Sequence, residues 1–134
     1  MANFAKIILN DGLATPVAHT FDIKTNDNGV SIYEDRASGV PVGYSKLIAR
    51  ISETKEQRTV KIDILVPVLE AVSGANTQGF TPPAKVAYQN IGKFEFRTSS
   101  RSTLQQRKDL VAFMQNAINL ELVSSLVADT ESIG

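Results

Sequence analysis

The chain has 134 residues, 43% of them hydrophobic and 21% charged, and its 14 basic and 14 acidic residues cancel to a formal net charge of zero. This composition is typical of one folded domain, excludes global disorder, and gives the chain no bulk charge with which to attract a polyanion. The absence of cysteine excludes disulfides, thiolate nucleophiles and cysteine-based zinc sites.

The N-terminal part of the chain is expected to form short strands joined by turns. Asn10-Asp11-Gly12 separates two apolar segments and predicts a hairpin over residues 1–24, with Pro16 interrupting its second strand. Thr25–Gly29 predicts another turn, and Val30–Glu34 alternates as a short strand does. The apolar stretch near the N-terminus is too short for a signal peptide, and no apolar run reaches the ~20 residues of a membrane span. A cytoplasmic product without a membrane partner is therefore expected.

Two central segments, Lys46–Ser52 and Val60–Val68, alternate strictly and predict an antiparallel hairpin. One face of this hairpin is an ordinary apolar stripe. The other face mixes cations with polar and apolar side chains, namely Lys46, Ile48, Arg50, Ser52, Thr59, Lys61, Asp63 and Leu65. Because polar sheet faces are common, the residues alone leave two interpretations open, a solvated surface and a surface that binds phosphates.

A loop and a last strand are expected next. Ala71–Pro83 is rich in Gly, Asn, Thr and Pro, and long loops of this kind tend to be functional or mobile. In the strand expected at Lys85–Arg97, the alternation changes phase at Gly92. A bulge at Gly92 would keep Ile91, Phe94 and Phe96 on the core face and place Tyr88, Asn90, Lys93, Glu95 and Arg97 on the other. A simple bend at Gly92 is the alternative.

From Ser102 onward the apolar period becomes helical. Ser102 and Gln105 fit a capping box, and the helix that follows has an apolar stripe of Leu110, Phe113, Met114, Ala117 and Ile118. Asn119 is expected to cap a second, short helix, so that helices occupy residues 102–129. Strands first and helices last predict an α+β fold, with an N-terminal hairpin, an antiparallel five-stranded sheet within 30–97, and helices on one face.

One copy of this fold leaves apolar surface uncovered. Two short helices cover only part of a broad sheet, and the last strand is long and has no proline to blunt its edge. An isologous homodimer is the economical solution, with two sheets joined edge to edge and the helices of each copy packed over the sheet of the other.

The order and spacing of several segments resemble the coat proteins of single-stranded RNA bacteriophages, the leviviruses. These segments are ATPVAHTFDI, GVPVGYSK, KLIARISETKEQRTVKIDILVPV, GANTQGFTPP, AYQNI and SRSTLQQRKDLVAFM, and together they span nearly the whole chain. No single motif is diagnostic, whereas their order is. The resemblance implies a single coat-protein domain over 1–134 and an interlocked homodimer with a continuous sheet. It also implies that the dimers form a T=3 icosahedral shell around the RNA genome, with the sheet facing inward.

The resemblance also implies partners. One dimer would bind an operator hairpin of the genomic single-stranded RNA at the start of the replicase gene, which represses translation and marks the genome for packaging. One maturation protein per particle would join the shell, which would be assembled in the bacterial host cytoplasm and reside in the virion.

Site residues follow from the resemblance in three groups. The RNA-binding group is Lys46, Ile48, Arg50, Ser52, Thr59, Lys61, Asp63, Tyr88 and Asn90. The loop between dimers is represented by Gly74, Asn76, Gly79, Pro82 and Pro83, and the dimer interface by Phe94, Phe96, Leu110, Phe113 and Met114. Lys46, Arg50 and Lys61 would contact phosphates, and Tyr88 would stack on an unpaired base. Asp63 departs from the family, which often has Lys at that position, and Ile48 stands where some members have a small polar residue.

Two other classes of protein are weighed against a capsid subunit. A cystatin-like α+β inhibitor module would bind no nucleic acid and would not form particles. A small enzyme would need a nucleophile, a metal set or a phosphate loop, and the sequence offers none. The single histidine, His19, fits a structural hydrogen bond near an edge strand, and Asp11, Asp27 and Asp35 fit turns. We therefore expect no catalytic residue, no cofactor and no metal site.

Overall fold

The computed structural model describes residues 5–70 and 83–134 and divides the chain into two compact units. A sheet unit consists of Met1–Thr54 and Arg58–Arg97, and a C-terminal unit consists of Lys55–Gln57 and Thr98–Gly134. The strands lie almost entirely in the first unit and both α-helices lie in the second. That residues 1–134 act as a single domain stays a prediction.

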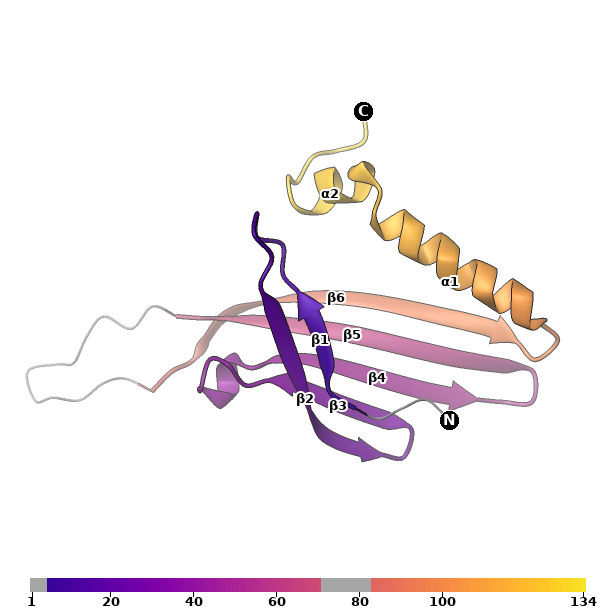
Figure 1. The fold of residues 1–134 in the computed structure, drawn as a ribbon, viewed down its shortest axis with the longest axis horizontal. Coiled ribbons are helices and arrows are strands. Elements are labelled where there is room, and N and C mark those ends of the chain that lie inside the picture. The colour runs from indigo at the N-terminus through magenta and orange to yellow at the C-terminus, as the bar shows by residue number, and fades with distance from the viewer. Residues whose placement is uncertain (1–4, 71–82) are drawn as a thin grey trace, which may run out of the picture. The chain divides into compact units, whose positions relative to one another are not determined.

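Six strands form one sheet in which spatial order follows chain order (Figure 1). The strands are β1 (Ile7–Asn10), β2 (Ala18–Asp27), β3 (Val30–Asp35), β4 (Ser45–Glu53), β5 (Gln57–Leu69) and β6 (Val86–Ser99). Each neighbouring pair from β1 to β5 is antiparallel. The predicted α+β class is confirmed. In the described part of the chain, the region from residue 30 onward contributes four strands to the sheet, not the predicted five, and the N-terminal hairpin β1–β2 joins the same sheet as its first two strands. A short 3-10 helix, η1 (Pro41–Gly43), lies in the loop expected before β4.

The connection from β1 to β2 is wider than the predicted tight turn. Residues 11–17 lie outside both strands, so Pro16 precedes β2, and the prediction that it interrupts the strand is wrong. The Asp11 carboxylate accepts hydrogen bonds from the backbone N–H groups of Leu13, at 3.2 Å, and Val17, at 3.0 Å. The Asp11 N–H donates to the Val17 carbonyl at 3.0 Å. These bonds close the loop without any ladder bond from Pro16, which has no N–H to give.

The turn from β2 to β3 is tighter than predicted. Only Asn28 and Gly29 lie between the strands, and both have positive φ, 50° and 80°. Positive φ at both central residues is the requirement of the two-residue turn whose twist suits an antiparallel hairpin. The pairing of β2 with β3 shifts register between Ile23 and Thr25, which marks a bulge at Lys24.

The core of the described residues lies on one face of the sheet. Phe21, Tyr33 and Leu47 are its buried hydrophobic residues, and Ile7, Leu9, Ala49, Ile62 and Ile64 pack against them. Tyr33 lies directly opposite Leu47, and Leu47 directly opposite Ile64, so this face runs across β3, β4 and β5. Nearer the turn between β4 and β5 the same face is more exposed to solvent, as the 46% exposure of Ile51 shows.

Strand β6 runs through Gly92 without ending. Beyond Gly92, Phe94 and Phe96 are half-buried and meet edge to face, with ring centroids 5.7 Å apart and an interplanar angle of 87°. Ile91, by contrast, is 53% exposed. The side chains of Phe94 and Phe96 therefore share a face, as predicted, while the bulge at Gly92 stays a prediction.

In the C-terminal unit, helix α1 (Leu104–Ile118) begins one residue later than predicted. Thr103, in extended conformation, is the N-cap, and its hydroxyl accepts from the Gln106 N–H at 3.2 Å. The Gln106 side chain accepts from the Thr103 N–H at 2.9 Å, which completes a capping box. The prediction of this box on Ser102 and Gln105 is wrong by one residue.

Helix α2 (Glu121–Val127) begins after a short break. Asn119 has helical φ and ψ, and its N–H donates to the carbonyls of Gln115 and Ala117, so it ends α1. Leu120 is the N-cap of α2 and makes no side-chain cap bond, so the prediction that Asn119 caps α2 is wrong. Neither described helix alone is long and apolar enough to cross a membrane. Taken together, α1 and α2 pass that test by length and composition, with a bend of 57° between them.

Candidate nucleic-acid interface

The register of β4 and β5 places the predicted polar residues on one face. Lys46 pairs with Leu65, Ile48 with Asp63, Arg50 with Lys61, and Ser52 with Thr59. Residues directly opposite in an antiparallel pair project to the same side, and alternate pairs share that side. These eight residues, called the polar face below, therefore lie together, opposite the face that carries Leu47 and Ile64. The predicted division into two faces is confirmed, whereas the role of the polar face in RNA binding is not tested by it.

An ion pair crosses the middle of the polar face. The Arg50 Nη1 donates to the Asp63 Oδ2 at 2.6 Å, and the two side chains are 45% and 13% exposed. Asp63 lies opposite Ile48, one pair along from Arg50, so the contact is diagonal. The family resemblance implies that both residues contact RNA, and it does not predict that they bind each other. A search for opposite charges at diagonal positions of the predicted hairpin would have found the pair.

Beside this ion pair lies an open hollow of about 540 Å³, lined by Arg50, Lys61, Asp63, Lys93, Phe94 and Glu95. Glu95 accepts from the Arg97 Nε at 2.7 Å. The hydrogen bond from Arg97 holds the pKa of Glu95 below its usual value, and the positive charge of Lys61 adds to the effect. Glu95 and Lys61 are thus close enough to interact. Lys93 and Glu95 were not among the implied site residues, although the predicted bulge placed both on this side of β6.

The placement of Tyr88 and Asn90 depends on Gly92. Tyr88 is 60% exposed and Asn90 is exposed, so both side chains can reach a ligand. In a regular strand, however, even-numbered residues project to the side of Phe94 and Phe96. A phase change at Gly92 is needed to bring Tyr88 and Asn90 to the side of Glu95. Their role in RNA binding therefore stays a prediction.

A buried carboxylate borders the polar face on β3. Glu34 is 6% exposed and lies directly opposite Lys46. Its Oε1 is 3.5 Å from the Lys24 Nζ and 4.0 Å from the Arg36 Nη2. Buried carboxylates need such partners, and the bulge at Lys24 helps to supply one. This cluster could not be predicted from the sequence, because no sequence feature of Lys24 marks it as a bulge residue.

The remaining predicted site residues are placed only in part. Gly74, Asn76, Gly79 and Pro82 lie outside the described residues, and Pro83 is exposed. Of the residues expected at the dimer interface, Phe94, Phe96, Leu110 and Met114 are half-buried. Phe113 is 71% exposed. No residue of α1 or α2 is buried.

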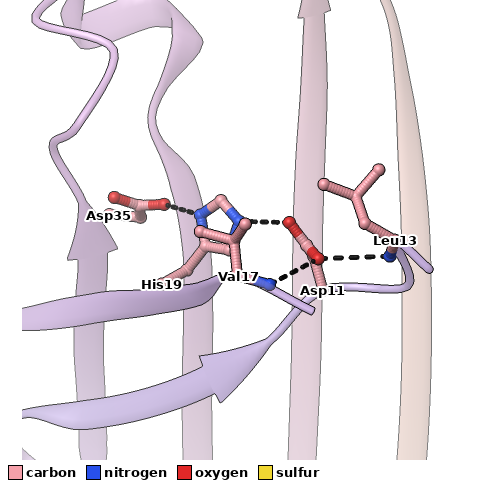
Figure 2. A network of polar contacts seen from close by, with 5 residues as sticks. All are labelled: Asp11, Leu13, Val17, His19 and Asp35. Atoms are coloured by element: carbon pink, nitrogen blue, oxygen red, sulfur yellow. Dashed lines mark hydrogen bonds and ion pairs between the residues drawn. The ribbon is translucent and has the colours of Figure 1, made fainter. Parts of the chain in front are cut away.

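His19 lies between two carboxylates, as Figure 2 shows. Its Nε2 is 2.9 Å from the Asp11 Oδ2, and its Nδ1 is 3.0 Å from the Asp35 Oδ2. Both ring nitrogens can donate only when the imidazole is protonated, because an ionised carboxylate only accepts. The bonds to Asp11 and Asp35 accordingly raise the pKa of His19, while bonds from the Val17 N–H and from His19 lower the pKa of Asp11. The predicted structural role of His19 is confirmed, since it links the β1–β2 loop to the end of β3.

These features define an open antiparallel sheet that presents a surface of mixed charge. Among residues 5–70 and 83–134, no group of three or more metal-ligating side chains comes together. The model of the family described as levivirus coat protein matches residues 2–133. The chain belongs to this family, and it is a structural capsid protein, not an enzyme. A capsid protein builds the shell of a virion by self-association, and family membership sets aside the inhibitor and enzyme alternatives.

Solved structures agree with this assignment. The chain is similar to that of the virus-like particle of bacteriophage ESE058, with 25% identity, a TM-score of 0.91, and 99% of this chain and 100% of the other covered. It is similar to that of the virus-like particle of bacteriophage NT-214, with 28% identity, a TM-score of 0.88 and the same coverage. The bacteriophage GA capsid protein shares the fold at 13% identity and a TM-score of 0.79, with 98% of each chain covered. A comparison with curated proteins gives no match.

Proposed function

We propose that this capsid protein forms dimers that assemble into an icosahedral shell around genomic RNA, with the polar face turned toward the RNA. The observation that carries the RNA-binding part is the register of β4 and β5, which sets Lys46, Arg50 and Lys61 on one face. Phosphates bind such cations independently of sequence, with an affinity that falls as salt rises. Particle formation is supported by the names of the two relatives above, both virus-like particles of bacteriophages.

The exposed apolar surface supports a dimer. Strand β6 is 14 residues long and ends the strand order of the sheet, so no strand among the described residues pairs with its outer edge, where a strand of a second copy would fit. On α1, Leu104, Val111 and Ile118 are 60%, 44% and 56% exposed and follow one another at seven-residue spacing. Exposed apolar rows of this kind mark interaction surfaces. A second copy, pairing along β6 and packing against α1, would cover both.

The first experiment expresses the full chain and examines the product by electron microscopy and by its ratio of absorbance at nucleic-acid and protein wavelengths. Uniform particles that protect RNA from nuclease are expected. A monodisperse monomer in light scattering, without particles, would refute the assembly.

The second experiment compares Lys61→Ala with Lys55→Ala, a control at the exposed turn between β4 and β5. Lys61→Ala should leave particles intact and weaken RNA binding by the disassembled protein. It should also flatten the slope of log K against log salt by about 0.7, the value of one phosphate contact to a single strand. Equal effects of the two variants would show that the polar face does not contact RNA.

A third experiment concerns sequence-specific binding and repression, which we propose for a hairpin at the start of the genome's replicase gene. Tyr88→Ala should weaken binding of that hairpin by the ~1–3 kcal/mol of a stacked base, and should relieve repression of a reporter fused to the same segment. Unchanged affinity and unchanged repression would remove Tyr88 from the site. In the same proposal, the shell is assembled in the host cytoplasm and takes up one maturation protein.

A further inference from the structure

The polar face carries one carboxylate, Asp63, where an RNA-binding surface would gain most from a cation. Asp63 is 13% exposed and holds the Arg50 guanidinium at 2.6 Å. Glu95, which also lines the hollow, accepts a hydrogen bond from Arg97 at 2.7 Å. Among the described residues, Lys61 and Lys93 line the same hollow without an ion pair of their own. The lining of the hollow therefore carries three cations and two carboxylates, and of these carboxylates Asp63 is bonded to Arg50 while Glu95 is bonded to Arg97, which is not part of the lining.

We propose that Asp63 attenuates phosphate binding by the polar face. This coat protein then binds RNA only weakly when the contacts are made to the RNA phosphate backbone alone. The inference rests on the proposed RNA-facing role of this surface. A phosphate that approaches Arg50 must share the guanidinium with Asp63 or displace it, and it also meets the negative charge of Asp63. Because this opposition is the same for every RNA sequence, Asp63 lowers the affinity for all of them alike, and only RNAs that add contacts through their bases still bind tightly.

The opposite effect, in which Asp63 raises the affinity of the polar face for RNA, fits the same contact with Arg50. A charge-assisted bond of this length restrains the Arg50 side chain, so Asp63 could instead position Arg50 for a phosphate. Removing the charge of Asp63 would then weaken RNA binding. With side chains 45% and 13% exposed, Arg50 is the more accessible member of the pair in either case. Binding measurements on charge variants separate the two roles.

The test uses the full chain in disassembled form and fluorescein-labelled oligouridylate and oligoadenylate, titrated at several salt concentrations. Asp63→Asn keeps the shape of the side chain and removes its charge. Attenuation predicts tighter binding of both probes and a salt slope steeper by about 0.7. The affinity of Asp63→Asn relative to the unaltered protein should then fall about 2.6-fold between 50 and 200 mM salt, since a fourfold change in salt raised to the power 0.7 gives this factor.

The matched control is Glu53→Gln. Glu53 lies on the same hairpin, on the opposite face, and forms a long 4.0 Å pair with Arg58, so the substitution makes the same change in net charge away from the polar face. If Glu53→Gln tightens binding as much as Asp63→Asn does, total charge is responsible and the proposal fails. Weaker binding by Asp63→Asn, or no change, also overturns it.

A double variant keeps the test decisive if Asp63→Asn alone disturbs the fold. Arg50→Gln with Asp63→Asn replaces an ion pair of zero net charge with two amides that can still bond to each other. Attenuation predicts that this variant binds both probes with the salt slope of the unaltered protein, whereas a positioning role predicts a clear loss of affinity. Lys61→Ala separates the two proposals: if it weakens binding while Asp63→Asn changes nothing, only the attenuation fails. If it also has no effect, the RNA-facing role fails with it.

Discussion

Replacing three glycines with alanine should separate two causes of strain in the sheet unit. Gly29 has a φ of +80°, and a Cβ added there would lie 2.9 Å from the carbonyl oxygen of Ile51. Gly39 has a φ of +72° but would place its Cβ in open space. Gly12 has open space as well and no such φ. Alanine at Gly29 would therefore meet both backbone strain and a close contact, alanine at Gly39 would meet strain alone, and alanine at Gly12 would meet neither.

The magnitudes follow from these differences. A left-handed conformation costs a non-glycine residue about 1–2 kcal/mol, and alanine recovers about 0.4–1 kcal/mol by restricting the unfolded chain. At Gly29 the new methyl group would also push against β4, where the Ile51 N–H donates to the Gly29 carbonyl at 2.9 Å. Losing that bond costs about a further 0.5–1.5 kcal/mol. We expect Gly29→Ala to lower the free energy of unfolding by about 1–3 kcal/mol, Gly39→Ala by about 0–1.5, and Gly12→Ala not at all.

Urea unfolding at one fixed protein concentration, followed by far-UV circular dichroism, measures these changes as shifts of the midpoint at constant m-value. The fixed concentration matters because self-association contributes to the apparent stability. If Gly29→Ala and Gly39→Ala are equally destabilising, contact with Ile51 adds nothing and the steric argument is wrong. A destabilised Gly12→Ala would show that φ and open space do not predict the cost.

Two further predictions concern side-chain hydrogen bonds. Because the raised pKa of His19 means that the folded state holds its proton more tightly, the stability from His19 is fully present below its usual value near 6.5 and is lost as pH rises through the raised folded value. The urea midpoint of the unaltered protein should thus fall relative to that of His19→Asn between pH 6 and 9, and a constant difference would contradict the bridge to Asp11 and Asp35. Thr103→Ala should lower the free energy of unfolding by about 1 kcal/mol, and Ser102→Ala should change it little, as measured by urea titration. A larger loss for Ser102→Ala than for Thr103→Ala would show that Ser102 is the N-cap.

The sequence could predict the faces of β4 and β5 because a strand has only one way to divide its side chains. Once Lys46–Ser52 and Val60–Val68 are recognised as a hairpin, alternation alone separates Leu47 and Ile64 from Arg50 and Lys61. What alternation cannot supply is the rotamer of each side chain. The bond between Arg50 and Asp63 depends on those rotamers, and so the site could be outlined from the sequence while its internal charge balance could not.

Local ambiguity accounts for the errors at the helices. Ser102 has a glutamine three residues later, and so does Thr103, so both satisfy the pattern of a capping box. Only the backbone decides between them, and it is Thr103 that adopts the extended conformation of an N-cap. Asn119 was a similar case, since asparagine suits the end of one helix as well as the start of the next.

Gly92 decides how far the polar face extends onto β6. Among the described glycines, positive φ occurs only at Gly29 and Gly39, so a bulge at Gly92 is not of the type that requires a left-handed glycine. Nothing lies within 4 Å of a Cβ added at Gly92, so close packing does not require glycine there either. Conformational strain and crowding are thus both removed as reasons for this residue. What remains is the bare strand surface that glycine leaves between Asn90 and Lys93, where a ligand can approach the backbone closely.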